Sequence, residues 1–191
     1  MTRLFVAIDV SDAARRDMSA LCNGVPGAKW VKPDQMHLTL RFIGEVGGAM
    51  AHDVASALSE IDSPAFPITL AGVGSFGNGR GARVLWVGVG PCPELARLQA
   101  KIETALQRIG LPAERRKFHP HITLARLNGA PETRVADYLG AHSAFATEPC
   151  EAESFALYSS FLSQSGALHR VEASYPLAVP NMDAELAANE F

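Results

Sequence analysis

The pattern His-x-Thr-Leu, in which x is an apolar residue, occurs twice in the chain. It is HLTL at residues 37–40 and HITL at residues 121–124. On a β-strand, side chains alternate between the two faces, so the histidine and the threonine of each string share one face and the apolar residues share the other. A lone strand histidine is more often structural than catalytic, but a repeated string in two similar units indicates a shared task. The candidate site residues are therefore His37, Thr39, His121 and Thr123.

Two histidines brought together suit an in-line displacement at phosphorus, in which the nucleophile enters opposite the departing oxygen. A neutral imidazole takes a proton from the nucleophile while an imidazolium protonates the leaving group. Each threonine hydroxyl can donate a hydrogen bond to a phosphoryl oxygen. Arg126 lies five positions after His121, hence on the opposite face of an ideal strand. A twist or bulge near the strand end would turn its guanidinium toward the phosphate.

The elements around the two strings follow the same order in both halves of the chain. A strand, a helix and the histidine strand are predicted first at 4–9, 12–22 and 36–44, and then at 83–90, 93–109 and 118–127. Ser11 and Pro93 are typical helix starts, Gly110 is a typical helix stop, and Gly44 is expected to end the first histidine strand. Further helices are predicted at 49–61 and 132–142, and further strands at 66–73, 154–162 and 167–177. This order predicts an internally duplicated α+β unit.

Composition favours one globular domain that acts on small or local targets. The chain has 191 residues, a formal net charge of −3 and three widely spaced cysteines without a CxxC pair. These features argue against wrapping a long duplex, against a disulfide framework and against a structural zinc site, and they fit a reducing cytoplasm. The apolar run at the N-terminus is too short for a signal peptide, and no segment predicts a transmembrane helix. We expect one two-lobed domain over 1–180 and a loose tail over 181–191.

The strings RLFVAIDV, MHLTLRFIGEV, RVLWVGV, FHPHITLAR and LYSSFLSQSGALHRVEASYPL resemble the RNA 2′,3′-cyclic phosphodiesterases of the two-histidine phosphoesterase superfamily, also called 2′-5′ RNA ligase or LigT-like proteins. The likeness spans about residues 3–178. It implies a bilobal α+β fold in which antiparallel sheets line a central cleft and helices lie outside. It also implies metal-independent opening of a ribose 2′,3′-cyclic phosphate to a 2′-phosphate, with weak reversible 2′-5′ ligation of RNA ends.

The resemblance assigns roles to individual residues. His37 would be the proton donor to the departing O3′, and His121 the proton acceptor that activates water. Thr39, Thr123 and Arg126 would bind the phosphate, and Phe42 would flank the base or sugar. His169 departs from the family pattern, because relatives commonly have a tyrosine there. The implied partners are RNA termini or nucleotides with a 2′,3′-cyclic phosphate, the enzyme needs no cofactor, and we expect a monomer without membrane contact.

Several other readings remain open from the sequence. His119 and His121 form an i, i+2 pair that in principle holds a metal, although no carboxylate or cysteine cluster accompanies it. The basic run Arg115–Lys117 is either a solvated loop or an attractor of RNA phosphates. GVGSFG at 72–77 matches a dinucleotide-binding pattern, but no helix follows it, so we predict a hairpin-like loop. Rival functions are a non-catalytic module that binds RNA ends, and a phosphodiesterase for 2′-5′ oligonucleotides or ADP-ribose cyclic phosphate.

Overall fold

The computed structural model describes residues 1–78, 81–163 and 166–178. Within these residues one antiparallel sheet runs in the order β10-β9-β1-β3-β7-β6-β5, and β2 pairs with β7. A separate pair is formed by β4 and β8. The strands are β1 (Thr2–Asp9), β2 (Ala28–Trp30), β3 (His37–Val46), β4 (Phe66–Ile68), β5 (Leu70–Asn78), β6 (Gly81–Val89), β7 (His121–Leu127), β8 (Cys150–Ala152), β9 (Ser154–Ser163) and β10 (Gly166–Pro176).

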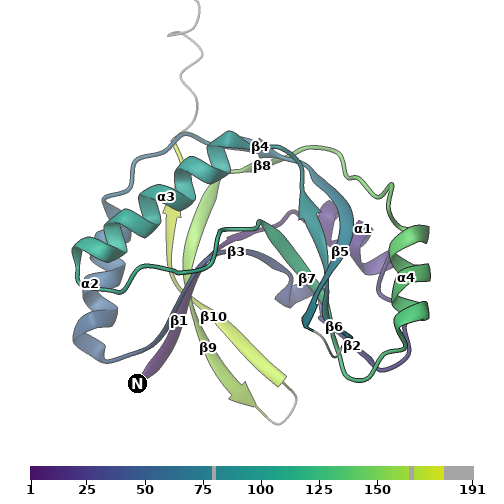
Figure 1. Cartoon of the computed structure of the whole chain (residues 1–191). Coiled ribbons are helices and arrows are strands. Elements are labelled where there is room, and N and C mark those ends of the chain that lie inside the picture. Colours follow the sequence, from purple (N-terminus) through teal and green to yellow (C-terminus); the bar gives the residue numbers. More distant parts are fainter. Residues whose placement is uncertain (79–80, 164–165, 179–191) are drawn as a thin grey trace, which may run out of the picture.

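The sheet joins two halves at its centre. One half contains β1, β3, β9 and β10, and the other contains β2, β5, β6 and β7. The two histidine strands meet where Leu38 of β3 pairs with Ile122 of β7. Figure 1 shows the halves as the two sides of an arch, with the strands toward its inside. The predicted α+β fold with two related lobes is confirmed by this arrangement.

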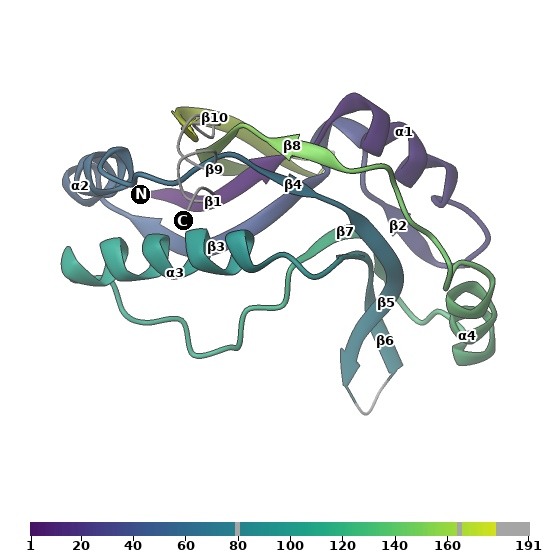
Figure 2. The same cartoon turned by 90° about the horizontal axis from the view of Figure 1, so that it is seen from above.

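Helices lie on the outer side of the strands in both halves (Figures 1 and 2). They are α1 (Asp12–Ala20), α2 (Gly48–Ser59), α3 (Pro93–Arg108) and α4 (Glu132–Ala141), with one 3₁₀ turn, η1 (Pro33–Gln35). Ser11 caps α1 as expected, because its hydroxyl accepts a hydrogen bond from the backbone N–H of Ala14 at 3.2 Å. The apolar stripe of α3 is fully buried, which explains why its periodicity was the clearest in the sequence. None of the described helices is long and apolar enough to cross a membrane.

Alternation along β1 separates the core from the inner face of the arch. Leu4, Val6 and Ile8 belong to the main apolar core, whereas Phe5 and Ala7 form a small separate cluster with Ala156 and Tyr158 of β9. The second cluster is therefore on the opposite face of the sheet. The same face carries the histidines and threonines of both strings.

Some sequence expectations were wrong or incomplete. The stretch 72–77, predicted as a loop, belongs to strand β5, which pairs with β6. Strand β3 does not end at Gly44 but continues to Val46, with Gly44 at a positive φ of 91° beside an irregularity in the register. The short strands β2 and β8 had no strong pattern and were not predicted. The tail expected at 181–191 lies outside the described residues.

Candidate active site

Both histidine strings lie at the centre of the sheet, on the strands that join the two halves. Leu38 and Ile122 pair with each other and are completely buried, so their neighbours in each strand face the inner side of the arch. His37, Thr39, His121 and Thr123 are accordingly half-buried. His37 and His121 each precede the Leu38–Ile122 pair by one residue, which makes them diagonal neighbours across the two strands. In a regular antiparallel pair such residues lie about 7–8 Å apart.

The two imidazole rings are held in the same way. Nδ1 of His37 lies 2.8 Å from the carbonyl oxygen of Gln35, and Nδ1 of His121 lies 2.7 Å from the carbonyl oxygen of His119. A carbonyl oxygen only accepts hydrogen bonds, so each neutral ring carries its proton on Nδ1. Nε2 of each ring is then left with its lone pair, which is the form needed to take a proton from another molecule.

A β-bulge at equivalent places brings one more residue of each strand to the inner face. In β7, Thr123 pairs with Trp86 and Ala125 with Leu85, so Leu124 is an extra residue in the register. In β3, Thr39 pairs with Ala7 and Arg41 with Val6, so Leu40 is extra in the same way. Beyond each bulge the alternation is reversed. Arg126 and its counterpart Phe42 therefore share the face of the histidines, and both are exposed.

An aromatic cluster from three strands surrounds His37. Its ring stacks on Phe5 of β1 at 4.9 Å between centroids, lies 6.0 Å from Tyr158 of β9, and meets His169 of β10 edge to face at 5.2 Å. The pKa of His37 is lowered to about 4. Burial is the largest cause and the nearby His169 the second; the carbonyl of Gln35 and the carboxylate of Asp9 act in the opposite direction, and Arg15 lowers the pKa further.

The surroundings of His121 are also aromatic but more open. Phe76 of β5 meets the ring of His121 edge to face at 4.8 Å, and Trp86 and His119 lie at 6.2 and 6.1 Å. Burial lowers the pKa of His121, the carbonyl of His119 raises it, and the imidazole of His119 lowers it. Buried nitrogens without a hydrogen-bond partner among the described residues occur in both clusters, at Nδ1 of His169 and at Nε1 of Trp86. Such groups are rare in folded proteins and deserve a functional explanation.

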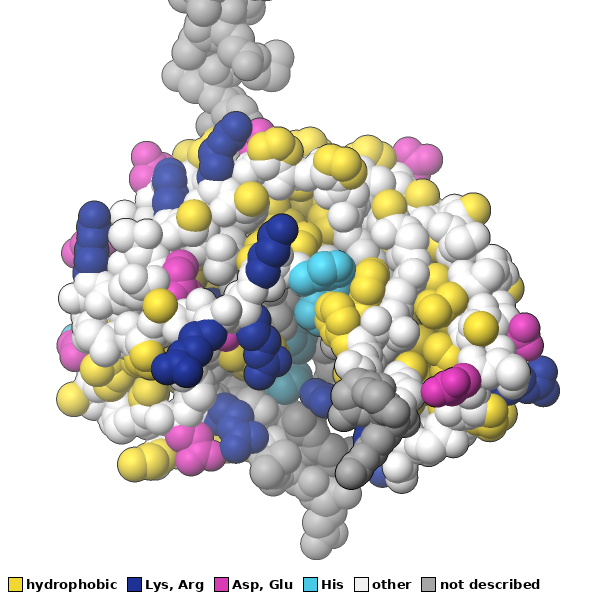
Figure 3. Space-filling model, viewed as in Figure 1, with side chains coloured by type: hydrophobic (Ala, Val, Ile, Leu, Met, Phe, Trp, Pro, Cys, Tyr) yellow, Lys and Arg dark blue, Asp and Glu magenta, His cyan; other side chains and the backbone are white. Residues whose placement is uncertain are grey.

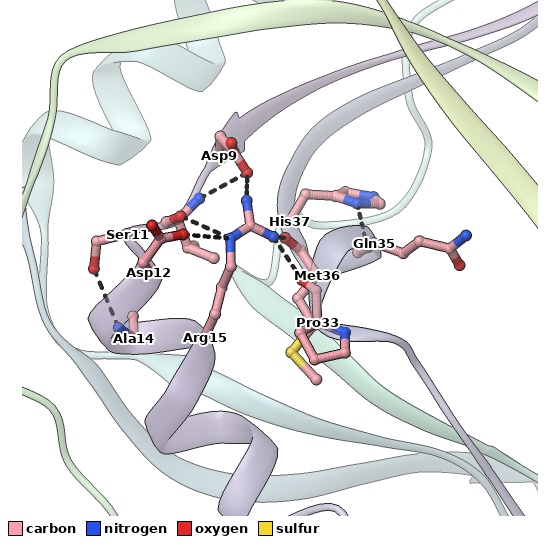
Figure 4. A network of polar contacts seen from close by, with 10 residues as sticks. Asp9, Ser11, Asp12, Ala14, Arg15, Pro33, Gln35, Met36 and His37 are labelled. Carbon is pink, nitrogen blue, oxygen red and sulfur yellow. Dashed lines mark hydrogen bonds and ion pairs between the residues drawn. The ribbon is translucent and has the colours of Figure 1, made fainter.

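Arg15 of α1 fixes the turn that precedes His37 (Figure 4). Its guanidinium forms an ion pair with Asp9 and donates hydrogen bonds to the carbonyl oxygens of Pro33 at 2.6 Å and Met36 at 3.2 Å. These two carbonyls flank Gln35, whose own carbonyl binds the His37 ring. Arg15 therefore acts on the orientation of His37 without touching it. No local sequence pattern predicts this contact, because it joins α1 to a turn 18 to 21 residues further along the chain.

A different buried cation holds the segment that leads to His121. Arg41 is 8% exposed on the helix-facing side of β3, and its Nε donates to Oε2 of Glu103 in α3 at 2.6 Å. Its other nitrogens donate to the carbonyl of Phe42 and, at 2.6 Å, to the carbonyl of Pro112. Burial raises the pKa of Glu103, but hydrogen bonds from the Glu114 N–H, Gln107 and Arg41 outweigh it, and the net pKa is lowered.

The inner face of the arch is hollowed. Figure 3 shows histidine side chains within a central hollow and Lys or Arg side chains along one side of it. Arg115 and Arg116 line a smaller depression with Arg41 and Pro112, and Lys117 follows them as a further exposed cation. A larger depression lies instead between α2 and α3, away from the histidines. We place the site at the histidine hollow, because the repeated chemical groups converge there and not between the helices.

No group of three or more His, Cys, Asp or Glu side chains that would suit a metal occurs in the described part of the chain. His119 is exposed and lies against Phe76 and Trp86 at 5.4 and 5.0 Å, as an aromatic neighbour of His121. Sequence reasoning did not find Phe5, Phe76 or Trp86 as parts of the site. Their contact with the histidines depends on strand pairing across the sheet, which no local sequence pattern predicts.

Comparisons with known proteins identify the family of this chain. The family model of the 2′-5′ RNA ligase superfamily matches residues 4–160. A protein of Archaeoglobus fulgidus named RNA 2′,3′-cyclic phosphodiesterase is 34% identical over 171 residues, covering 88% of this chain and 96% of that protein. A protein of Thermotoga maritima with the same name is 32% identical over 178 residues, covering 88% of this chain and 92% of its own length.

Solved structures show the same architecture. TT0787 of Thermus thermophilus superposes with a TM-score of 0.79 at 25% identity, covering 94% of this chain and all of that one. Escherichia coli LigT in complex with 3′-AMP superposes with a TM-score of 0.75 at 28% identity, covering 92% of this chain and 98% of LigT. The sequence match over most of the chain and the shared fold lead to one conclusion: this protein belongs to the 2′-5′ RNA ligase superfamily.

Proposed function

We propose that the protein is an RNA 2′,3′-cyclic phosphodiesterase that opens terminal cyclic phosphates to 2′-phosphates with His37 and His121 and without a metal. One observation carries the proposal: two equivalent histidines on paired strands share a face, and each has its Nδ1 held by a carbonyl so that Nε2 is free. The names of the Archaeoglobus and Thermotoga relatives support the same substrate. The substrate is an RNA end or nucleotide, and we propose a cytoplasmic monomer.

The proposed step is an in-line displacement. Water attacks phosphorus opposite O3′, and the P–O3′ bond breaks while the new P–O bond forms. His121 takes the proton of the water, and His37 gives a proton to O3′. The product is a 2′-phosphate with a free 3′-hydroxyl. Thr39 and Thr123 donate hydrogen bonds to the phosphoryl oxygens, Arg126 supports their charge, and Phe42 flanks the nucleoside.

The role of His37 as donor requires proton uptake on binding. With a pKa of about 4, its ring is neutral at pH 7 in the free protein. A phosphodiester anion in contact with the ring favours the charged form, so substrate binding raises the pKa of His37. In the free protein both rings are thus neutral and can accept a proton. Substrate binding then favours protonation of His37, which makes it the donor.

The test is hydrolysis of a 2′,3′-cyclic nucleotide in the presence of a chelator, followed by identification of the product. We expect the wild type to retain its activity and to form the 2′-phosphate, and the single variants His37→Ala and His121→Ala to lose most of the turnover. Full activity in either variant would defeat the assignment. Saturable binding of the cyclic nucleotide without any turnover would instead favour a module that only binds RNA ends.

A further inference from the structure

An aromatic surface lies open beside His121, and the proposed hydrolysis does not use it. Phe76 of β5 is 36% exposed, in edge-to-face contact with His121 at 4.8 Å and tilted on Trp86 of β6 at 5.2 Å. The register places Trp86 opposite Thr123, and Phe76 opposite Val84, on the inner face of the arch. This Phe76–Trp86 surface is thus continuous with the proposed reaction centre.

Glycines in β5 and β6 make room for this surface. A Cβ atom at Gly74 would overlap the indole ring of Trp86, and one at Gly88 would lie 3.3 Å from it. The indole therefore lies flat across the two strands. Glycine within a strand commonly marks a place where another group approaches the backbone closely. Phe76 packs against this indole on one side and against the ring of His121 on another.

The equivalent region beside His37 is closed. Phe5 and Tyr158 stack on each other at 5.1 Å and are only 2% and 9% exposed, and His169 packs on Phe5 at 5.0 Å. In that half the aromatic rings pack around the histidine, while Phe42, on the same face of β3, is 61% exposed. A phenyl ring is therefore exposed on each side of the proposed phosphate position, Phe42 on the His37 side and Phe76 on the His121 side.

Phe76 lies on the His121 side of the proposed phosphate position, and this indicates which part of a substrate it contacts. In the proposed step, His121 handles the proton of the group that enters or leaves opposite O3′. When that group is the 5′-hydroxyl of a nucleoside instead of water, its sugar and base extend to the His121 side. We propose that the Phe76–Trp86 surface is the subsite for the nucleoside linked through O5′ in a 2′-5′ phosphodiester. This inference rests on the proposed function, because it uses the same two histidines.

The corresponding reaction is balanced without any further reactant. The 3′-hydroxyl attacks phosphorus, the P–O3′ bond forms and the P–O5′ bond breaks. His37 takes the proton of the 3′-hydroxyl, and His121, in its protonated form, gives a proton to O5′. The products are a 2′,3′-cyclic phosphate and a nucleoside with a free 5′-hydroxyl, and the cyclic phosphate is then the substrate of the hydrolysis.

Stacking of the second base on Phe76 has a measurable consequence. Base–aromatic stacking changes affinity by a factor of about 5 to 150 per base when the ring is removed. The test compares kcat/KM for a 2′-5′-linked adenosine dinucleotide with kcat/KM for adenosine 2′,3′-cyclic phosphate. Only the first substrate has a nucleoside on the His121 side. The ratio of the two values isolates the subsite from any displacement of His121, which slows both reactions.

For Phe76→Ala we expect this ratio to fall about 10-fold or more. Phe76→Tyr keeps an aromatic face, and its ratio should stay within about threefold of the wild type. Phe42→Ala is the matched control on the other side, where both substrates carry the same nucleoside, so both reactions weaken and the ratio is unchanged.

Two outcomes would overturn the inference and leave the proposed function intact. One is an unchanged ratio in Phe76→Ala. The other is a wild type that hydrolyses the cyclic phosphate but does not cleave the 2′-5′ dinucleotide. Absence of both reactions in the wild type would instead overturn the proposed function itself.

Discussion

The two histidine strands carry the same string, but their surroundings differ in a systematic way. Around His37, rings from β1, β9 and β10 close the space, and the pKa of His37 is lowered to about 4. Around His121, the rings of Phe76 and Trp86 leave a partly exposed surface, and burial lowers the pKa of His121 as well. A duplicated unit thus retains the chemical groups of the site while their environments become different.

The supports behind the two rings also differ. The carbonyl that binds His37 belongs to a short turn fixed by Arg15, whereas the carbonyl that binds His121 ends an irregular segment attached to the core through Arg41 and Glu103. Equivalent hydrogen bonds at the rings are therefore produced by unrelated contacts. The hydrogen bond from Nδ1 to a carbonyl is thus common to both halves, whereas the contacts that fix the carbonyl differ between them.

The strongest test of the comparison removes both rings. If the two histidines act as one catalytic unit, His37→Ala and His121→Ala each lower kcat about 100- to 10,000-fold. The double variant should then be about as slow as the slower single variant, because groups that act together are not additive. Single-turnover rates on a 2′,3′-cyclic nucleotide measure this. Multiplication of the two losses in the double variant would show that the halves act independently.

Removal of Arg41 tests the support on the His121 side. Arg41→Met leaves the largely buried carboxylate of Glu103 without its cation, and loss of one partner of such a pair costs about 3–5 kcal/mol in the free energy of unfolding. Denaturant unfolding followed by circular dichroism measures this change. The control is Arg3→Met, because the Arg3–Glu45 pair is about half exposed and worth at most about 1 kcal/mol. Equal losses in the two variants would contradict a structural role for Arg41.

The two threonines test whether the halves share the charge of the phosphate equally. Thr39→Val and Thr123→Val each remove one hydroxyl donor while keeping a β-branched shape. Loss of one such donor lowers kcat about 100- to 1,000-fold. Steady-state kinetics on the cyclic nucleotide show whether kcat or KM changes. A change confined to KM would mean that the hydroxyl binds the ground state and the transition state equally well.

The shared face of the histidine and threonine in each string could be predicted from the sequence because strand alternation is local and the pattern is repeated. The neighbours of His37 could not, since Phe5, Tyr158 and His169 come from three strands whose pairing is set by the whole sheet. The glycine-rich stretch 72–77 shows the same limit. Its glycines look like loop residues, yet Gly74 is required in a strand because the indole of Trp86 occupies the space of its side chain.

The position of Arg126 was only half predictable. On an ideal strand Arg126 would lie on the face opposite to His121, and only a twist or bulge would bring it to the same face. The register contains such an extra residue at Leu124, and another at Leu40 in the equivalent place of β3. The residues of the two strings do not predict the bulge, because it depends on how β6 and β1 pair with the histidine strands. The bound role of Arg126 stays a prediction.

Arg15 tests the support on the His37 side. In Arg15→Met the Pro33 and Met36 carbonyls lose their donor, and the turn that carries the Gln35 carbonyl is less constrained. A displacement of a reacting group by about 1 Å can cost up to about 100-fold, so we expect kcat/KM to fall about 10- to 100-fold. Arg15→Lys keeps the positive charge but lacks the forked guanidinium that reaches both carbonyls, so it should recover only part of the loss. An unchanged kcat/KM in Arg15→Met would mean that the aromatic cluster alone orients His37.

The smallest expected effect concerns pH and separates the two histidines most directly. The value of kcat/KM reports the pKa values of the free enzyme. We therefore expect a bell-shaped profile for uridine 2′,3′-cyclic phosphate, with one limb near pH 4 from His37 and the other below pH 6.5 from His121. Exchange of the donor and acceptor roles gives the same limbs, so the profile tests the environments and not the roles. An optimum above pH 7 would contradict both shifts.

Variants of the two accessory histidines then assign each limb. His169 lowers the pKa of His37 as the second-largest cause after burial, so His169→Phe should raise that pKa and move the limb near pH 4 upward. The imidazole of His119 lowers the pKa of His121, and the His119 carbonyl that raises it remains in His119→Phe, so the other limb should also move upward. A merely structural role would change the height of the profile and leave its limbs in place. Movement of the same limb in both variants would show that the two halves titrate as one group rather than as two separate environments.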